Sequence, residues 1–440
     1  MKNKFPLLLF AFILAYNTGH AQWYKEKFVI GTFADPRIFG VTRNADDAKD
    51  TLSYKLARGA YINLLTGPQF YNGAQDFSLM DKTLGLASAY GMHVMAIDSK
   101  LQVTTDKFSD NDAQNVLAHF KSLDPKRREA LGGYSFGGEF PVTKAGQVKK
   151  WAGFYNNNDT DRPAYTYLLP CYGFKTRAEY EQYLDAYLSE SNPAQKLKIV
   201  AYDYYPFLSP SLMASYFYNL GIIKEKAGDR PVWYFIASTT KRTLPDINDY
   251  NLRFMAYCPL AYGSKGALYY TYESLPEKMG MNYYEAIIGL SGQPTAKYAK
   301  VRTINYFITN FAGPIIMKND CVGTYHVSNS PTNENIPDKY ILQRNNRYVS
   351  SIGNPNILVG IFKSPNGGKY YLMLVNKSSN PVSNVAVAVP GSKTIQELPA
   401  SENYHGAKNY TKLKTSGSGG KTNFVINNIG GGEMSIIEVD

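Results

Sequence analysis

Eight short runs of apolar, aromatic and β-branched residues recur along the first two-thirds of the chain, with starts about 31 to 38 residues apart. Most of these runs are apolar on both faces, as is typical of buried parallel strands, and few of them alternate cleanly. The pattern predicts eight parallel strands. The runs start at Phe28, Gly59, His93, Leu131, Tyr165, Lys198, Val232 and Gly266.

Helical patterns separate the runs. The segments that start at Asp112 and Arg177 carry apolar residues at helical spacing, and Thr176 is suited to cap the second of them. Eight strand–helix units in about 280 residues predict an α/β fold, a (β/α)8 TIM barrel. An open doubly wound sheet is the alternative, but the turn after Phe28 lacks the Gly-rich loop typical of that fold.

The texture of the sequence changes after Met317. Residues 318–338 are rich in Asn, Ser, Pro and Thr, which predicts a linker or an ordered loop, and residues 339–440 alternate short strands with turns. We therefore expect a barrel domain over residues 22–317 and a small all-β sandwich over residues 339–440.

The first 21 residues predict export. Two lysines precede an apolar run that is too short to span a bilayer, and a small-residue site before Gln22 would allow cleavage. No cysteine follows the site to accept a lipid, and no later segment is long and apolar enough for a transmembrane helix. We expect a periplasmic or secreted protein with residues 1–21 removed.

Composition excludes several function classes. The net charge is +11, and removal of residues 1–21 leaves 45 basic against 36 acidic residues, or +9, but the charges are dispersed and nucleic acid is not an expected partner. The four histidines after residue 21 and the three cysteines have no metal-ligand spacing, so we expect no metal, no cofactor and inert thiols. There is no G-x-S-x-G elbow and no P-loop.

Carboxylates follow five of the eight predicted strands. In a TIM barrel the catalytic groups come from the C-terminal strand ends, so these acids should surround one mouth. Gly137 and Gly138 precede one of them and leave room for a ligand, which makes Glu139 the strongest catalytic candidate. Glu273 and Asp203 are the next catalytic candidates, and Asp35 and Asp98 are expected to bind substrate.

Aromatic residues near the same strand ends suit sugar binding, because a tyrosine offers a flat apolar face with a polar tip. The chain has 37 tyrosines. Tyr204 and Tyr205 beside Asp203 are the preferred platform, ahead of Trp233, which opens its strand. The full set of expected substrate-binding aromatics is Tyr172, Tyr204, Tyr205, Trp233 and Tyr272.

Three segments carry a family resemblance: GGYSFGGEFP, AYDYYPF and LAYGSKGALYYTYES. The chain resembles secreted bacterial TIM-barrel glycoside hydrolases of a clan-A-like superfamily with a C-terminal β-sandwich. The resemblance implies that Glu139 is the general acid/base. Two departures stand out: Gly138 replaces the Asp that usually precedes this Glu, and the seventh strand ends in Ser238, Thr239 and Thr240 where the clan places a nucleophilic Glu.

Two functions stay open at this point. The first is a glycoside hydrolase that cleaves a glycan or oligosaccharide by carboxylate chemistry without a metal, with Glu273 or Asp203 as the second acid. The second is a carbohydrate-binding protein on a hydrolase barrel that has lost catalysis.

Overall fold

The computed structural model describes residues 22–33, 47–67, 77–96, 109–189, 192–208, 210–241, 246–274, 283–328, 336–344, 346–398 and 410–440. The predicted (β/α)8 barrel is confirmed: eight parallel strands close into a ring in chain order, and β1 pairs with β9. All eight apolar runs supply one barrel strand each. The barrel strands are β1 (Val29–Phe33), β2 (Leu64–Gly67), β3 (His93–Ala96), β4 (Leu131–Gly138), β5 (Ala164–Leu168), β6 (Val200–Tyr202), β7 (Val232–Ala237) and β9 (Gly266–Tyr270).

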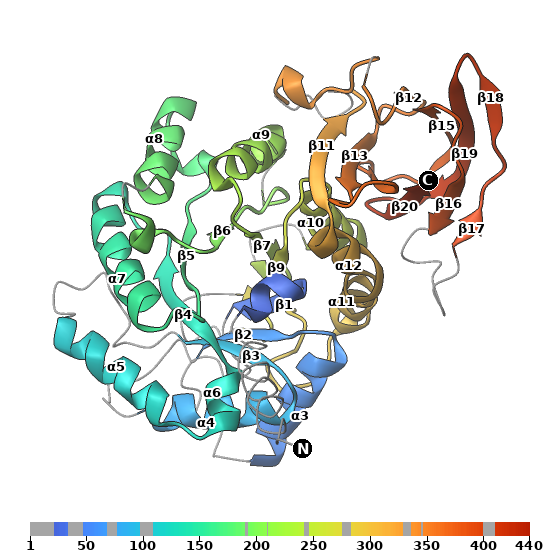
Figure 1. Cartoon of the computed structure of the whole chain (residues 1–440). Helices are drawn as coiled ribbons and strands as arrows, with labels where there is room; N and C mark the ends of the chain where they lie inside the picture. The colour runs from blue at the N-terminus through green and yellow to red at the C-terminus, as the bar shows by residue number, and fades with distance from the viewer. Residues whose placement is uncertain are drawn as a thin grey trace, which may run out of the picture.

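Helices surround the ring, as the view in Figure 1 shows. The helices are α2 (Trp23–Glu26), α3 (Asp47–Gly59), α4 (Ser78–Ala89), α5 (Asp110–Ser122), α6 (Pro125–Ala130), α7 (Ala145–Asn158), α8 (Arg177–Leu188), α9 (Pro210–Ala227), α10 (Asp249–Ala261), α11 (Ala296–Phe307) and α12 (Gly313–Lys318). Single turns of 3-10 helix occur at Val142–Lys144, Cys171–Gly173, Pro193–Gln195 and Asp338–Tyr340, and a π-helical turn, Ile308–Ala312, joins α11 to α12. A small hairpin pairs β8 (Thr240–Lys241) with β10 (Tyr283–Tyr284).

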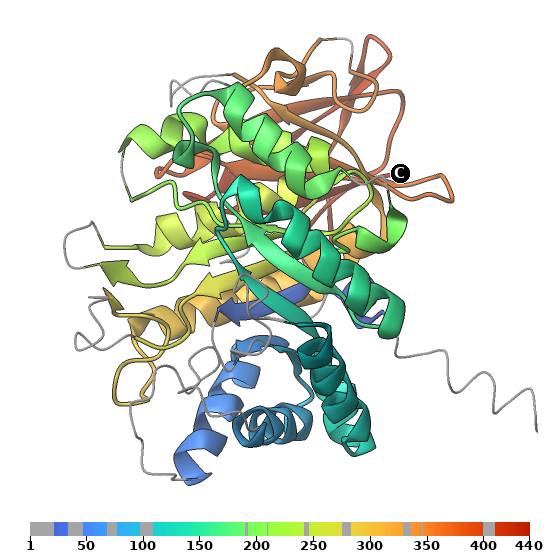
Figure 2. The same ribbon diagram turned by 90° about the vertical axis from the view of Figure 1, so that its left-hand side faces the viewer.

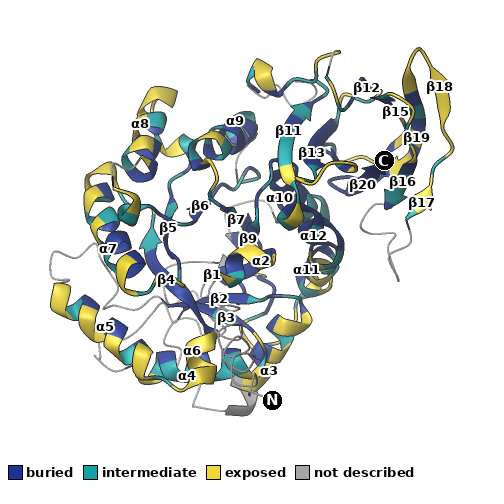
Figure 3. Ribbon diagram, viewed as in Figure 1, coloured by how far each residue is buried: buried dark blue, intermediate teal, exposed yellow. Residues whose placement is uncertain are grey.

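Local sequence signals set several helix ends. Thr176 caps α8 through its side chain, and Glu179 completes a capping box. Figure 3 shows the expected division of such surface helices into a buried and an exposed face, clearly in α5 and α8. These helices therefore pack one apolar stripe on the barrel, as the helical spacing predicts.

Helix α2 lies across the N-terminal end of the barrel. The indole of Trp23 donates a hydrogen bond to the carbonyl oxygen of Gly132 (2.9 Å) and stacks on His93, with ring centroids 4.2 Å apart. Trp23 also packs near Trp233, which is fully buried inside the barrel. This end of the barrel is thus filled by aromatic rings, which leaves the C-terminal end for a site.

The predicted β-sandwich is confirmed as two antiparallel sheets packed on their own apolar core. Strand β11 begins at Asp320, so part of the segment 318–338 that we expected to be a linker or an ordered loop is a strand paired with β13. The six-stranded sheet contains β11 (Asp320–His326), β13 (Ile357–Lys363), β14 (Tyr370–Asn376), β20 (Met434–Val439), β16 (Ile395–Leu398) and β17 (Thr411–Lys412). The four-stranded sheet contains β12 (Ser351–Ile352), β15 (Val382–Pro390), β19 (Lys421–Ile429) and β18 (Ser416–Ser418).

Helix α10 joins the two domains because it is buried on all sides, between the barrel strand β7 and the sandwich strands β13 and β14. Its end packs tightly: a Cβ added at Gly360 would lie 2.4 Å from the carbonyl oxygen of Ala261. Thr324 of β11 donates a hydrogen bond to the same carbonyl (2.9 Å), and Tyr250 donates to the carbonyl of Lys377 (2.7 Å). Figures 1 and 2 both show the sandwich stacked against one side of the barrel.

We predict that Gly360→Ala destabilises the protein, because the added methyl group meets backbone that cannot move without separating the domains. The expected loss is roughly 1–3 kcal/mol of unfolding free energy, measured by denaturant titration. Gly417→Ala is the matched control, since a Cβ there meets nothing within 4 Å. Equal stability of the two variants would show that the domain interface is not tightly packed at α10.

Candidate active site

Two glycines and Glu139 form a tight turn at the end of β4. Gly137 has a φ of 78°, and a Cβ at Gly138 would lie 2.3 Å from the carbonyl oxygen of Tyr167 on β5. Glu139 itself takes a φ of 56°, a left-handed conformation that is uncommon for a residue with a side chain, and its amide donates to the carbonyl of Tyr167 (2.9 Å). The Asp that usually stands at position 138 in the similar family therefore has no room here.

Asp203 follows β6, two strands from Glu139 in the ring. The side chains of alternate residues point into a barrel, and Asp203 continues the inward series of Ile199 and Ala201, which line the barrel interior. In β4 a β-bulge between Ser135 and Gly138 breaks this alternation, and the carboxyl group of Glu139 forms a hydrogen bond with that of Asp203. The two acids thus converge over β5, where Tyr167 lies between their strands.

The carboxyl groups of Glu139 and Asp203 lie side by side and are joined by a hydrogen bond. Asp203 is buried, at 6% exposure, whereas Glu139 is exposed. Burial, followed by the charge of Glu139 and a hydrogen bond with its carboxyl group, raises the pKa of Asp203 well above its usual range. Burial and the neighbouring charge therefore both favour the protonated form of Asp203. Its Oδ1 atom is buried and has no hydrogen-bond partner within the described part of the chain.

Aromatic rings line the mouth beside this pair. Phe33 of β1, Tyr167 of β5 and Tyr270 of β9 lie around one another, with centroids of Phe33 and Tyr167 at 5.6 Å and of Phe33 and Tyr270 at 5.1 Å. Tyr205 stands 5.9 Å from Tyr270. Burial raises the pKa of both Tyr167 and Tyr205, and the charges of Glu139 and Asp203 raise it further, so both hydroxyl groups stay protonated.

Glu273 does not join the pair. Its carboxylate is buried and accepts a hydrogen bond from the hydroxyl of Ser53 on α3 (3.2 Å), on the side of β9 that faces this helix. Strand β9 is nevertheless four positions from β4 in the closed ring, so Glu273 follows the strand opposite Glu139. The structure therefore separates the two expected catalytic partners of Glu139: Asp203 is adjacent and Glu273 is across the barrel.

The expected aromatic platform is only partly available. Tyr172 is exposed (41%) and meets Tyr204 edge to face, with centroids 5.0 Å apart, and Tyr205 is half-buried. Tyr204 is buried and its hydroxyl pairs with that of Ser215 (2.7 Å). Tyr204 can therefore support Tyr172 but offers no open ring face to a sugar.

Two expected substrate-binding rings are not at the mouth surface. Trp233 is fully buried near the N-terminal end of the barrel, so its ring cannot contact a ligand at the C-terminal end. Tyr272 is also fully buried, and its hydroxyl donates to the backbone carbonyl of Ser53 (3.0 Å). The expected ligand contacts Asp35 and Asp98 lie outside the described residues.

The end of β7 supplies hydroxyl groups and no acid. Ser238 is buried and donates to the backbone carbonyl of Thr271 (2.8 Å). The first acid after β7 is Asp246, which accepts hydrogen bonds from Thr240 (2.6 Å) and from the ammonium group of Lys297 (3.1 Å). These bonds tie Asp246 to the β8 and α11 region and lower its pKa despite partial burial. The end of β7 therefore carries no carboxylate before Asp246.

Sequence reasoning missed three residues of the mouth: Phe33, Tyr167 and Tyr270. The alternation of side chains along each strand could have identified them. Each is the last inward-facing aromatic residue of its strand and lies two residues after an inward-facing position, which is Gly31, Tyr165 or Leu268. No group of three His, Cys, Asp or Glu residues that could hold a metal occurs among the described residues. None of the three cysteines forms a disulfide; Cys258 is buried, whereas Cys171 and Cys321 are half-buried.

Comparison with known proteins gives a fold and no close relative. No family model matches the chain, and no curated protein matches it. A β-galactosidase from Bacillus circulans sp. alkalophilus is similar in structure over 96% of this chain and 100% of its own, with a TM-score of 0.60 and 9% identity. AbfB, a family 51 α-L-arabinofuranosidase from Bifidobacterium longum, matches over 94% of this chain and 96% of its own (TM-score 0.51, 10% identity). An α-amylase from H. orenii is similar over 94% of this chain and 100% of its own, with a TM-score of 0.51 and 10% identity.

The chain shares its fold, a (β/α)8 barrel with an all-β domain, with these three enzymes. At these identities the likeness concerns the fold and confirms the resemblance at that level only. The function has to be argued from the site.

We predict that Asp203→Asn removes a pH-dependent destabilisation. The pKa of Asp203 is higher in the folded than in the unfolded chain, so its contribution to stability is complete below the unfolded value of about 4 and is lost as the pH rises through the folded value. Asparagine cannot ionise. Thermal unfolding of the variant should therefore match that of the parent near pH 4 and exceed it increasingly at higher pH.

Two further variants make this stability test specific. Glu139→Gln removes the neighbouring charge and so lowers the pKa of Asp203. The stability of this variant should therefore begin to fall at a lower pH than that of the parent. Glu26→Gln, an exposed acid on α2, should give a profile parallel to that of the parent. A constant offset between Asp203→Asn and the parent across all pH values would contradict the raised pKa.

Proposed function

We propose that the protein is a glycoside hydrolase that cleaves a glycan or oligosaccharide at the C-terminal mouth of the barrel, by carboxylate chemistry without a metal. The observation that supports this most is the hydrogen-bonded pair of Glu139 and Asp203, in which burial and a like charge favour the protonated form of Asp203 beside the exposed Glu139. A proton held at the working pH is what a general acid needs.

Glu139 acts as the acid and base of the proposed reaction. It is the exposed member of the pair and reaches the glycosidic oxygen, to which it gives the shared proton as the bond to the sugar carbon breaks. Loss of this proton leaves two adjacent carboxylates, and their repulsion favours the return of a proton. The attacking water supplies that proton as its oxygen bonds to the sugar, so the pair is restored at the end of each cycle.

Asp203 assists Glu139 and does not face it across the substrate. Two carboxyl groups joined by a hydrogen bond are about 3 Å apart from oxygen to oxygen, whereas the two acids of a glycosidase are separated by about 5 Å or more. The opposite carboxylate must come from another strand. Of the expected acids in the described residues, Glu273 follows the strand opposite β4, and it would have to leave Ser53 to reach the sugar.

The tyrosines of the mouth bind the sugar in this proposal. Tyr172 and Tyr205 present partly open rings on which the apolar face of a pyranose can pack. Neutral tyrosine hydroxyl groups add donors without adding negative charge beside the pair.

Export completes the proposal. The N-terminal segment that suggests a cleavable signal lies outside the described residues, and among the described helices none is long and apolar enough to cross a membrane. An exported hydrolase of this kind would meet polysaccharides in the periplasm or outside the cell.

A screen of aryl glycosides and polysaccharides tests the proposed hydrolysis. We expect release of reducing ends by the parent and a loss of roughly 10²- to 10⁴-fold in kcat for Glu139→Gln, the range of general acid catalysis. Glu26→Gln should keep full activity. Substrates with good leaving groups should be less affected, because they need less protonation. A Glu139→Gln variant as active as the parent would refute the assignment.

A saccharide-binding protein without turnover is the second candidate. The observation that favours it is the end of β7, where Ser238 and the paired Asp246 leave no free carboxylate. This function predicts that oligosaccharides raise the melting temperature of the parent while no substrate in the screen is cleaved.

A further inference from the structure

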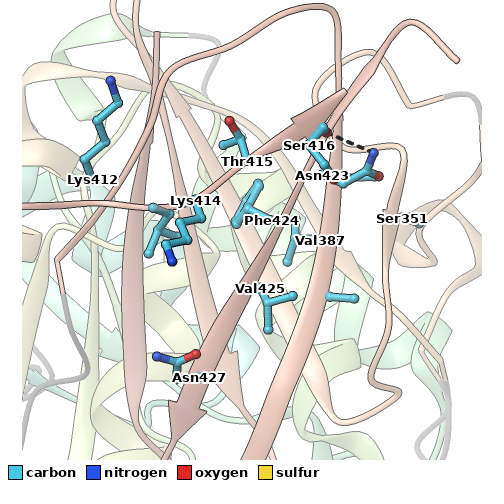
Figure 4. Close-up of a pocket in the computed structure, with 13 residues that line it drawn as sticks. Ser351, Val387, Lys412, Lys414, Thr415, Ser416, Asn423, Phe424, Val425 and Asn427 are labelled. Carbon is cyan, nitrogen blue, oxygen red and sulfur yellow. Dashed lines mark hydrogen bonds between the residues drawn. The ribbon is translucent and has the colours of Figure 1, made fainter. Parts of the chain in front are cut away.

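The outer layer of the sandwich carries a groove that the barrel mouth does not explain. A depression of about 600 Å³ lies over the four-stranded sheet, and Figure 4 shows side chains that line it. Helix α10 packs against β13 and β14 of the other sheet, so the groove belongs to the layer of the sandwich remote from the barrel. Figure 1 also shows β18 and β19 on the far side of the sandwich.

The floor of the groove is built from cross-strand neighbours. Ser351 of β12 lies opposite Ala388 of β15, which lies opposite Asn423 of β19, and Asn423 in turn lies opposite Ser416 of β18. The Asn423 amide donates to the carbonyl of Ser416 (3.2 Å), a bond drawn in Figure 4. This row crosses all four strands with small or polar side chains, so the floor is open along its length.

A second pair of cross-strand neighbours makes one part of the floor apolar. Ala386 lies opposite Val425, and Val425 is 44% exposed although valine is usually buried. Asn427, two residues further along β19, adds an exposed amide beside this patch. An apolar strip flanked by amides and hydroxyl groups suits a sugar ring, which has apolar faces and polar edges.

Charge decides which kind of sugar fits. The segment from Lys412 to Ser416 borders the groove and brings two lysines, and no ion pair in the described part of the chain involves Lys412 or Lys414. None of the residues that line the groove is acidic, nor is any residue of the four strands of this sheet. Residues 339–440 carry eleven Lys or Arg against five Asp or Glu, a net charge of +6.

Three described acids of the sandwich are engaged away from the groove. Glu438 of β20 pairs with Lys369 (2.7 Å), Glu397 of β16 accepts a hydrogen bond from Ser435 (2.9 Å), and Glu433 is buried. Among the described residues, no acid lines the groove or pairs with its two lysines, so its positive charge favours an anionic ligand.

We propose that this groove is a second carbohydrate site, which binds an anionic glycan such as a uronate-containing polysaccharide. The ammonium groups of Lys412 and Lys414 pair with carboxylates of the chain, and the Asn and Ser side chains bind sugar hydroxyls. None of the described residues that line the groove is an exposed aromatic on which bases could stack, so a nucleic acid fits it less well. The site holds the enzyme on a polymer independently of the barrel mouth.

Binding of polygalacturonate to the full-length Glu139→Gln protein tests the site. This background prevents turnover of the probe, and the readout is binding, so failure here would leave the proposed hydrolysis untouched. We expect Lys412→Gln/Lys414→Gln to weaken the apparent Kd by roughly fivefold or more at low salt, since two exposed ion pairs are lost. Asn427→Ala should weaken it further. Dextran, which is neutral, should not bind in the groove of the Glu139→Gln protein or of its lysine variant.

Matched controls separate a groove from general positive charge. Lys25→Gln/Lys27→Gln removes the same charge from exposed positions on and beside α2, at the barrel's N-terminal end, and should leave the Kd within about twofold of the parent value, because screening limits distant charges. The proposal is overturned if this control weakens binding as much as the groove variant does. It is equally overturned if polygalacturonate does not bind, or if duplex DNA binds more tightly through Lys412 and Lys414.

Discussion

The parallel pairing of β1 with β9 closes the ring, and the position of every candidate catalytic group depends on that closure. An open sheet would place β4 and β9 far apart, whereas the ring sets their C-terminal ends on opposite walls of one mouth. Glycines make the closure possible. A Cβ at Gly31 of β1 would lie 2.4 Å from the side chain of Leu268, and a Cβ at Gly266 of β9 would lie 2.4 Å from the ring of Trp233. Large side chains such as the Trp233 ring fill the barrel interior, and the glycines beside them leave the space that these side chains need.

The aromatic filling of the barrel also explains why the protonated form of Asp203 is favoured at the mouth. Aromatic rings from several strands occupy the barrel beneath and beside Asp203, so its carboxyl group is removed from water on a floor that offers few polar partners. Glu139 then adds its charge at hydrogen-bond distance. Burial and a like charge act in the same direction, and both favour the neutral form of Asp203. The exposed turn at Gly137 and Gly138 keeps Glu139 in contact with solvent, so one member of the pair stores the proton and the other can deliver it.

Much of this arrangement could be predicted from the sequence, because strand patterns are local. The eight apolar runs identify the barrel strands, and the rule that sites lie at C-terminal strand ends selects Glu139 and Asp203. The side to which a residue points beyond its strand is a tertiary property. Glu273 accepts a hydrogen bond from Ser53, 220 residues earlier in the chain, and nothing in the local sequence signals this. Trp233 looks like a platform residue by type, but its position at the start of β7 places it at the other end of the barrel. Helix α10 lacks a polar face because a second domain covers it, which a search for amphipathic helices does not anticipate.

The six-stranded sheet of the sandwich packs on the barrel, whereas the outer face of the four-stranded sheet is exposed. The six-stranded sheet supplies residues such as Leu358 and Met434 to the core shared with the barrel. Its acids Glu397 and Glu438 are hydrogen-bonded or paired, whereas Asp320 is exposed. The four-stranded sheet has no such neighbour, so its outer face can stay polar, and its lack of acids gives it a positive potential that packing does not require. An enzyme that acts on a polymer gains from a second contact, because a chain held at one point returns to the catalytic mouth as an intramolecular event with a raised effective concentration. A site on the outer sheet serves that purpose without occupying the mouth. The rigid interface at α10 then fixes the distance between the two contacts, and this distance determines which polymer lengths can engage both.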